Sequence, residues 1–316
     1  MKSLTLIICA VCLALGSALP TPTFAQSPDT SLVLGVYAPR LRFANSLARS
    51  NFANQVAQGL STRLGRPVKG RGFARKSEFV QQVKSGAVQI AVVGAQTHVE
   101  HPQWAPIAQG TRKGKPAAPM VLLSARGGSG VAALSGGPLA EIAVGRKDAW
   151  FRTQFLLQGL VPSSHFGKGR VARDAQGALS LVKLGKAQGA FVYQHDAQGG
   201  SIALTTRPVM YPVLVITGEV DDALRGELKQ AARSITLGSE GPLSAFATYN
   251  AGLFAALKLA LNGSLDRSQK LEPLWLAPGD PPSQIPAWPG ALGDLPAKTP
   301  APAAGFATPT PPPELF

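Results

Sequence analysis

Polar side chains follow two apolar stretches of the chain, at the point where each stretch ends. Gln96, Thr97 and His98 come shortly after the apolar residues 90–93, and Tyr193 and His195 come at the end of a second stretch, 189–193. Amide, hydroxyl and imidazole groups can hydrogen-bond a small polar ligand, and an imidazole can also exchange a proton near neutral pH. In open α/β sheets, ligands bind beyond the carboxyl ends of the strands. If both stretches are strands, these five residues are candidate ligand contacts.

The two stretches belong to one pattern that occurs twice. The pattern V-K-x-G-x-x-Q-x-A-x-V begins at Val83 and again at Val182. Each copy predicts a helix with lysine in its last turn, then a glycine in the left-handed conformation, then a buried strand. Two equivalent strand ends predict two similar lobes that face one cleft. The alternative is coincidence, because helix–glycine–strand sequences are common.

Two further groups of residues are candidate ligand contacts. Tyr37 and Arg40 follow the predicted strand 32–37, and the guanidinium of Arg40 could hold an anion through two parallel hydrogen bonds. Lys147, Asp148 and Arg152 lie at the start of a predicted helix, 148–159. The simpler interpretations are that Arg40 is a surface arginine and that Asp148 caps the helix.

The sequence gives little support for catalytic, metal or cofactor sites. His195 and Asp196 could form a general base, but neighbouring residues at one strand end usually point apart. His98 and His101 are close in sequence, yet no third metal ligand is near them. The glycine-rich stretch 127–130 lacks the pattern of a nucleotide-binding P-loop and is interpreted as a hinge or turn. We therefore expect no catalytic residue, no metal and no cofactor.

Residues 1–25 have the pattern of a signal peptide. Lys2 precedes an apolar run, 4–15, that is too short to span a membrane, and Thr23-Phe24-Ala25 supplies small residues for cleavage. An uncleaved anchor is the alternative. The two cysteines, Cys9 and Cys12, both lie in this run, so the mature chain has no disulfide and no thiol nucleophile. We expect a soluble protein exported to the periplasm.

The net charge of +14 allows a nucleic acid, a membrane surface or a small anion as partner. The cations are dispersed, and they are not interleaved with aromatic residues of the kind that stack on bases. Together with export, this distribution argues against nucleic acid. It favours a solvated basic face that also attracts small anions.

Predicted strands alternate with predicted helices, which is typical of an α/β fold with mostly parallel sheets. The predicted strands are 32–37, 67–73, 90–93, 104–108, 120–124, 141–145, 189–193, 202–206 and 209–216. The predicted helices are 44–64, 77–84 with Ser77 as its cap, 148–159, one capped by Asp174, 221–234 and 253–261.

The order of these elements predicts two lobes joined by a hinge of two crossings. The chain is expected to cross near residue 117 and to return near residue 207, so that 26–117 and 207–271 form lobe 1 and 118–206 form lobe 2. Residues 272–316 hold 13 of the 27 prolines, and we expect an extended or disordered tail there. A bilobed protein with such a hinge closes around a ligand.

Several segments resemble one protein family, in the same order along the chain. They are 34–39 (LGVYAP), 60–68 (LSTRLGRPV), 85–94 (SGAVQIAVVG), 185–190 (GKAQGA) and 224–232 with the later Gly241. These segments are similar to type II periplasmic solute-binding proteins, specifically the branch that binds phosphonate, phosphite or phosphate for ABC importers. The resemblance implies a bilobed type II periplasmic-binding-protein-like α/β fold, a small anionic solute as ligand and an ABC transporter permease as partner. We expect the protein to be a monomer.

The chain departs from this family at the start of the second-lobe helix. Phosphonate-binding members carry a turn, S-T-S-G, whose hydroxyls and amides hold the oxyanion, whereas this chain has GRKDAWFR at 145–152. Asp148 would repel a dianion there, and Arg146, Lys147 and Arg152 could offset the repulsion. A sensory or protein-binding relative, or an enzyme on the same fold, is therefore an alternative to an importer component.

Overall fold

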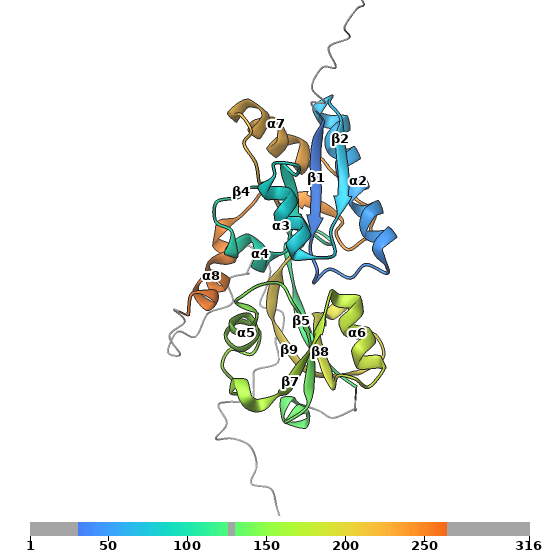
Figure 1. Ribbon diagram of the computed structural model, residues 1–316, viewed down its shortest axis with the longest axis vertical. Coiled ribbons are helices and arrows are strands. Elements are labelled where there is room, and N and C mark those ends of the chain that lie inside the picture. The colour runs from blue at the N-terminus through green and yellow to red at the C-terminus, as the bar shows by residue number, and fades with distance from the viewer. Residues whose placement is uncertain (1–30, 126–129, 264–316) are drawn as a thin grey trace, which may run out of the picture. The chain divides into compact units, whose positions relative to one another are not determined.

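The computed structural model describes residues 31–125 and 130–263 (Figure 1). The predicted signal peptide, most of the glycine-rich stretch 127–130 and the predicted proline-rich tail lie outside the described residues. In the two described ranges, no helix is both long and apolar enough to cross a membrane.

Six strands form the first sheet, in the order β11-β4-β10-β3-β1-β2. β1 pairs in parallel with β2 and β3, whereas β10 runs antiparallel to β3 and β4, and β11 runs antiparallel to β4. The strands are β1 (Leu32–Tyr37), β2 (Val68–Gly72), β3 (Ile90–Val93), β4 (Ala105–Thr111), β10 (Val213–Ile216) and β11 (Ala245–Ala247). The helices of this part are α2 (Ser46–Leu64), α3 (Lys76–Lys84), α4 (Ala95–Glu100), α7 (Asp222–Arg233) and α8 (Ala255–Leu261).

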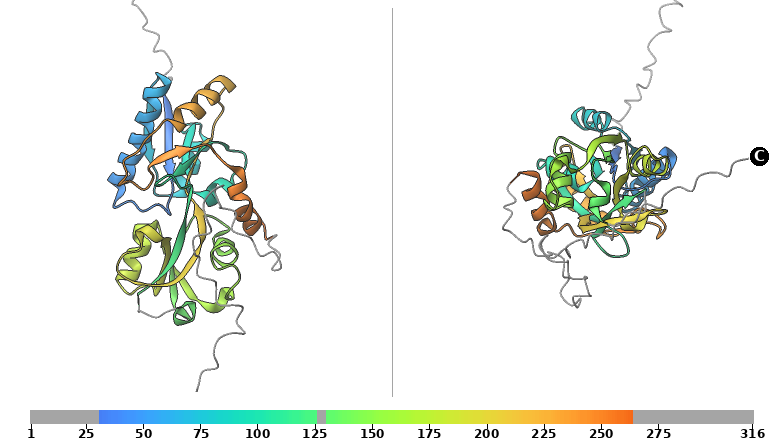
Figure 2. Two further views of the ribbon diagram at one scale, coloured as in Figure 1. Left: turned by 180° about the vertical axis from the view of Figure 1, so that it is seen from behind. Right: turned by 90° about the horizontal axis from the view of Figure 1, so that it is seen from below.

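Five strands form the second sheet, in the order β7-β6-β8-β5-β9. β6 pairs in parallel with β7 and β8, and β5 runs antiparallel to β8 and β9. The strands are β5 (Ala117–Ser124), β6 (Pro138–Ile142), β7 (Gly167–Ala172), β8 (Gly189–Tyr193) and β9 (Ser201–Met210). α6 (Ala175–Lys183) and the segment that begins with α5 (Asp148–Trp150) lie on either side of this sheet (Figure 2).

The two sheets share one strand order, which confirms the repeat found in the sequence. The order β4-β10-β3-β1-β2 of the first sheet corresponds to β9-β5-β8-β6-β7 of the second. The repeated pattern forms α3 and β3 in one sheet and α6 and β8 in the other. Its glycines, Gly86 and Gly185, have φ values of 72° and 67°, the left-handed conformation predicted for them.

The expectation of mostly parallel sheets is wrong, because five of the nine strand pairings are antiparallel. All five involve β5 or β10, the strands that follow the crossings, or the edge strand β11. When the chain arrives from the other sheet, it forms a strand whose direction is opposite to that of its neighbours. β5 and β10 are therefore antiparallel to both strands beside them. The sequence shows where strands lie but not from which side each one is entered.

The chain passes between the sheets at two places. The first passage, 112–116, joins β4 to β5, and the second, Tyr211 and Pro212, joins β9 to β10. β9 continues past the expected return near residue 207, because Val209 and Met210 still pair with Ala118 and Ala117 of β5. The separate strands expected at 202–206 and 209–216 are therefore one long β9 followed by the short β10.

Of the three predicted N-caps, Asp174 is confirmed, and Ser77 and Asp148 are wrong. The carboxylate of Asp174 accepts a hydrogen bond from the amide of Gly177 at 2.9 Å, and that of Asp221 accepts from Leu224 at 2.7 Å. Ser77 does not cap α3, which begins one residue earlier, after Arg75, without a side-chain cap. The helix expected over 148–159 is regular only in α5 and continues as a wider π-helical turn, Phe151–Leu156.

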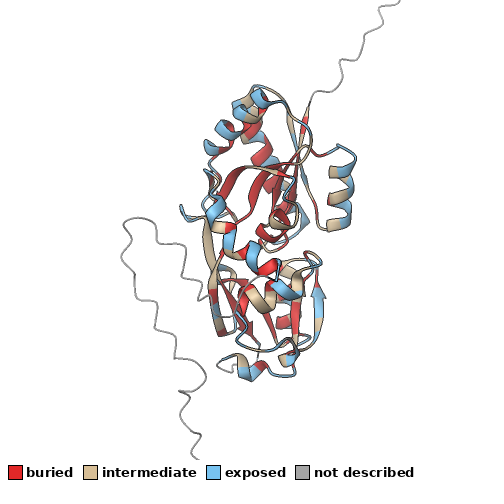
Figure 3. Ribbon diagram, turned by 90° about the vertical axis from the view of Figure 1, so that its left-hand side faces the viewer, coloured by how far each residue is buried: buried red, intermediate tan, exposed pale blue. Residues whose placement is uncertain are grey.

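Buried residues concentrate in the central strands and on the inner helix faces. β3, β8 and β10 are buried along their whole length, while helices such as α7 keep an exposed outer face (Figure 3). This is the distribution that helices on both faces of a sheet produce. The candidate site lies at the ends of the buried strands, in the loops that follow them.

Candidate functional site

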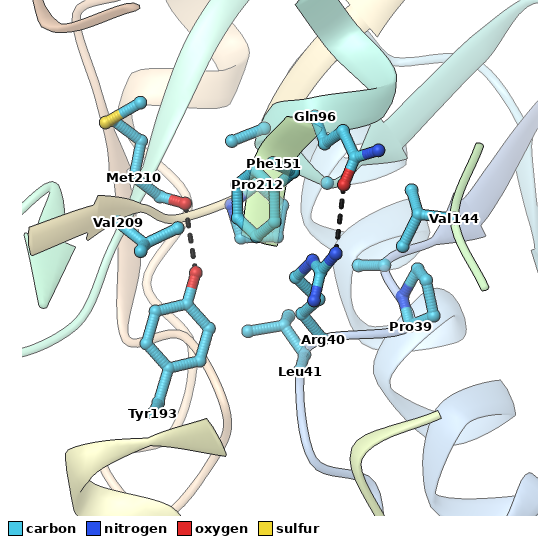
Figure 4. A pocket seen from close by; sticks show the side chains of 13 residues that line it. Pro39, Arg40, Leu41, Gln96, Val144, Phe151, Tyr193, Val209, Met210 and Pro212 are labelled. Atoms are coloured by element: carbon cyan, nitrogen blue, oxygen red, sulfur yellow. Dashed lines mark hydrogen bonds between the residues drawn. The ribbon is translucent and has the colours of Figure 1, made fainter. Parts of the chain in front are cut away.

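A pocket lies where the loops after β1, β3 and β8 meet the second passage between the sheets (Figure 4). The loops at its rim come from both sheets, as the sequence predicted for a cleft between two lobes. Most of its lining is apolar, and Arg40 supplies the charge. The lining residues are Ala38, Pro39, Arg40, Leu41, Gly94, Ala95, Gln96, Val144, Phe151, Tyr193, Val209, Met210 and Pro212.

The guanidinium of Arg40 is the charged group of this pocket. Its side chain is 15% exposed, and it lies over the ring of Phe151 at 4.2 Å from the ring centre. Its Nη2 donates a hydrogen bond to Oε1 of Gln96 at 2.9 Å (Figure 4). The same Nη2 lies 3.9 Å from Oδ1 of Asp148. Its Nε is buried without a hydrogen-bond partner. Burial lowers the pKa of Arg40 and the neighbouring Asp148 raises it again; an arginine remains charged under these conditions.

Gln96 connects the two lobes through its amide. Its Nε2 donates to Oδ1 of Asp148 at 2.7 Å and to Oε1 of Glu100 at 3.0 Å. Glu100 also forms an ion pair with Lys76, whose Nζ lies 2.9 Å from its Oε2. Gln96 is therefore held from three sides and presents its carbonyl oxygen to Arg40.

Asp148 turns its carboxylate back onto the loop that precedes α5. The amides of Val144 and Gly145 donate to it at 2.9 and 3.1 Å. The expectation that Asp148 caps the helix is wrong, since the capped amides belong to the preceding turn and Asp148 is the first residue of α5. Gly145 packs against the carboxylate of Glu100 so closely that any Cβ would collide with it.

Arg152 and Lys147, the other predicted cations, have partners of their own. Arg152 lines an adjacent hollow that it shares with Arg40, Asp148 and Phe151, and it forms an ion pair with Glu141. Nζ of Lys147 donates to Oδ1 of Asn262 at 3.0 Å, on an exposed part of the surface.

Lys147 and four more of the predicted contacts do not line either hollow. Tyr37 is buried against Phe79, with ring centres 5.4 Å apart, and burial raises its pKa to about 12. Thr97 is fully buried, and Nε2 of His98 is 2.9 Å from the hydroxyl of Tyr249. His195 stacks on Tyr193 with ring centres 5.5 Å apart. The remaining candidates, Arg40, Gln96, Asp148, Arg152 and Tyr193, are brought together around the two hollows.

His195 and Asp196 do not point apart, as the sequence suggested, but lie 3.5 Å from each other. The two residues belong to a short 3-10 turn, Gln194–Asp196, so the alternation of a strand does not apply to them. Burial lowers the pKa of His195 to about 4, with Arg112 and Lys113 contributing, and raises that of Asp196 to about 6. Tyr193, the neighbour that does face the pocket, donates its hydroxyl to the carbonyl of Met210 at 3.0 Å (Figure 4).

Sequence reasoning missed Phe151, Met210 and Pro212, which line the pocket. By pattern alone, apolar residues in a helix or at a strand end cannot be told from core residues. Pro212 lies in the second passage between the sheets, and a correct position for that passage would have pointed to it. Among the described residues, no three histidine, cysteine, aspartate or glutamate side chains gather as they would around a metal ion.

A protein-family model matches residues 50–253, well over half of the chain, and its description is "ABC transporter, phosphonate, periplasmic substrate-binding protein". The chain belongs to this family. The match confirms the resemblance of the sequence segments, and it assigns the chain to periplasmic proteins that bind substrates for ABC transporters. No curated protein matches the chain.

Solved structures share the fold of this phosphonate-family chain. PhnD1 from Prochlorococcus marinus (MIT 9301), in complex with methylphosphonate, has a TM-score of 0.58 at 13% identity and covers 74% of this chain and 99% of its own. PA3383 of Pseudomonas aeruginosa, a binding protein component of an ABC phosphonate transporter, has a TM-score of 0.58 at 12% identity and covers 73% and 85%. XAC2383 from Xanthomonas citri, bound to ATP, has a TM-score of 0.54 at 14% identity and covers 74% and 96%. At these identities the likeness confirms the bilobed α/β fold.

Proposed function

We propose that this protein captures a small anionic ligand, phosphonate- or phosphate-like, between its two lobes and delivers it to an ABC importer. Membership of the phosphonate substrate-binding family supports the transport role. The buried guanidinium of Arg40, with an unpaired Nε in a pocket between the strand ends of both sheets, supports an anion as ligand.

Arg40 has the properties of an anchor for an anion. A buried guanidinium gains more from a charged ligand than an exposed one, because the attraction is less screened. Its position over Phe151 and its bond to Gln96 fix the plane of the guanidinium before a ligand arrives. A fixed donor loses little freedom on binding, which favours affinity.

The proposed mechanism is binding by lobe closure without turnover. Tyr211 and Pro212 at one passage and residues 112–116 at the other are the places where small backbone changes would move one sheet relative to the other. We propose that the protein acts in the periplasm as a monomer, after removal of residues 1–25, and that it hands its ligand to a membrane permease.

A thermal-shift screen of the purified chain tests this function. The panel is phosphate, phosphite, methylphosphonate, methanesulfonate and small carboxylates. A ligand that binds only the native state stabilises it by about 2.7 kcal/mol at a hundredfold excess over Kd. We expect at least one anion to raise the unfolding midpoint, and we expect R40Q to abolish the shift. The matched control is R71Q, since Arg71 lies on the edge strand β2, is exposed and is paired with Glu78 of α3. A shift that survives in R40Q would contradict the proposed anchor.

A further inference from the structure

The carboxylate of Asp148 already occupies the hydrogen-bond donors that surround Arg40. It accepts from Nε2 of Gln96 at 2.7 Å and from the amides of Val144 and Gly145 at 2.9 and 3.1 Å. The same carboxylate is the nearest anion to Arg40, at 3.9 Å. The hollow that adjoins the pocket therefore has a resident negative charge, and its carboxylate contacts donors from both lobes.

We propose that Asp148 determines the ligand specificity of this cleft by charge: it disfavours dianions and leaves monoanions as the preferred ligands. This inference rests on the proposed function, and it narrows the ligand to a phosphonate-like group in its singly charged form or to another monoanion of similar size. Specificity of this kind comes from an unfavourable interaction with the wrong ligand as much as from contacts to the right one.

Three cations near the site are engaged elsewhere, and Arg146 is exposed and lines neither hollow. Arg152 forms an ion pair with Glu141, Lys76 forms one with Glu100, and Lys147 is bonded to Asn262. Among the described residues that line the two hollows, Arg40 is therefore the cation available to a ligand. Its charge is already partly balanced by the carboxylate of Asp148.

Arg40 and Asp148 together set the charge balance of this site. Arg40 and Asp148 together are neutral, so a monoanion leaves one uncompensated negative charge and a dianion leaves two. Uncompensated charge is costly where water is largely excluded, and a like charge within a few ångströms adds repulsion. Without the charge of Asp148, a monoanion would be fully compensated and a dianion would leave only one charge.

Isothermal titration calorimetry with methanesulfonate and sulfate tests the inference. The two probes are similar tetrahedral oxyanions with one and two charges at neutral pH. We expect the wild-type chain to bind methanesulfonate at least tenfold more tightly than sulfate. D148N keeps the size of the side chain and should reduce this ratio at least tenfold. D222N removes the same charge from a side chain that is exposed on α7, and it should leave the ratio unchanged.

The outcomes separate this inference from the proposed function. The role of Asp148 would be overturned if D148N changed both affinities equally. It would also be overturned if neither the wild type nor D148N bound either probe. In both cases the anion screen would still decide the transport role. If wild type binds nothing in that screen but D148N binds sulfate, Asp148 is confirmed as the excluding charge and the proposed ligand-capture function fails. Adding R40Q to D148N should remove the gained sulfate binding, and retention of that binding would place the anion elsewhere and overturn the inference. Thermal unfolding of each variant checks that it is folded.

Discussion

Removal of the Asp174 carboxylate should destabilise the protein far more than removal of an ordinary helix cap. Asp174 caps α6 in the second lobe, and its Oδ2 also accepts a hydrogen bond of 2.6 Å from Nη2 of Arg49 on α2 in the first lobe. Arg49 is 6% exposed. D174A therefore removes a cap and leaves a buried guanidinium without its counter-ion.

The magnitude is the sum of two effects. Loss of an aspartate cap costs about 1 kcal/mol of unfolding free energy. Leaving one member of a buried ion pair without its partner costs about 3 kcal/mol more. The expected loss for D174A is therefore about 4 kcal/mol, and most of it belongs to Arg49.

Urea unfolding of three variants measures these two parts. D221A is the matched control, because Asp221 caps α7 through the same type of bond and no ion pair is found for it among the described residues. D221A should cost about 1 kcal/mol. R49M added to D174A removes the stranded charge, and it should restore about 2 kcal/mol relative to D174A alone. The reasoning is refuted if D174A costs no more than D221A, or if R49M fails to restore stability to D174A.

Two further predictions concern stability. G70A should destabilise the protein by about 3 kcal/mol, because a Cβ on Gly70 would collide with the backbone of Ala53 in α2, which cannot move as a side chain can. G226A is its control: a Cβ at this position in α7 meets no atom within 4 Å, and alanine should raise the stability by up to about 1 kcal/mol. Urea unfolding measures both variants. Equal effects of the two substitutions would contradict the close packing of β2 on α2. Burial lowers the pKa of His98 from 6.5 to about 4. Between these values the unfolded chain binds a proton that the folded chain does not, so His98 should reduce stability as the pH falls from 6.5 towards 4, by about 3 kcal/mol in total. H98Q, which can still bond Tyr249, should show a smaller loss over this pH range in urea titrations, and an unchanged loss would exclude His98 as its source.

Local signals in the sequence were sufficient for the elements and for the fold family. Gly86 and Gly185 end their helices in the left-handed conformation, and Asp174 and Asp221 cap theirs, because these effects depend on neighbours a few residues away. The apolar runs of β3 and β8 and their equal spacing from these glycines indicated the repeated lobe. The same segments indicated the periplasmic substrate-binding family, which the family model confirms.

The tertiary structure decided which residues at a strand end reach the pocket. Gln96, Thr97 and His98 were expected to act together, but they lie in α4, where each residue is rotated by about 100° from the one before it. Gln96 therefore faces Arg40, while His98 faces Tyr249. Likewise, Asp148 and Gln96 are 52 residues apart in the chain, and they meet only because the two lobes come together. Contacts at such separation depend on how the sheets are entered and packed, and no local pattern of residues specifies that.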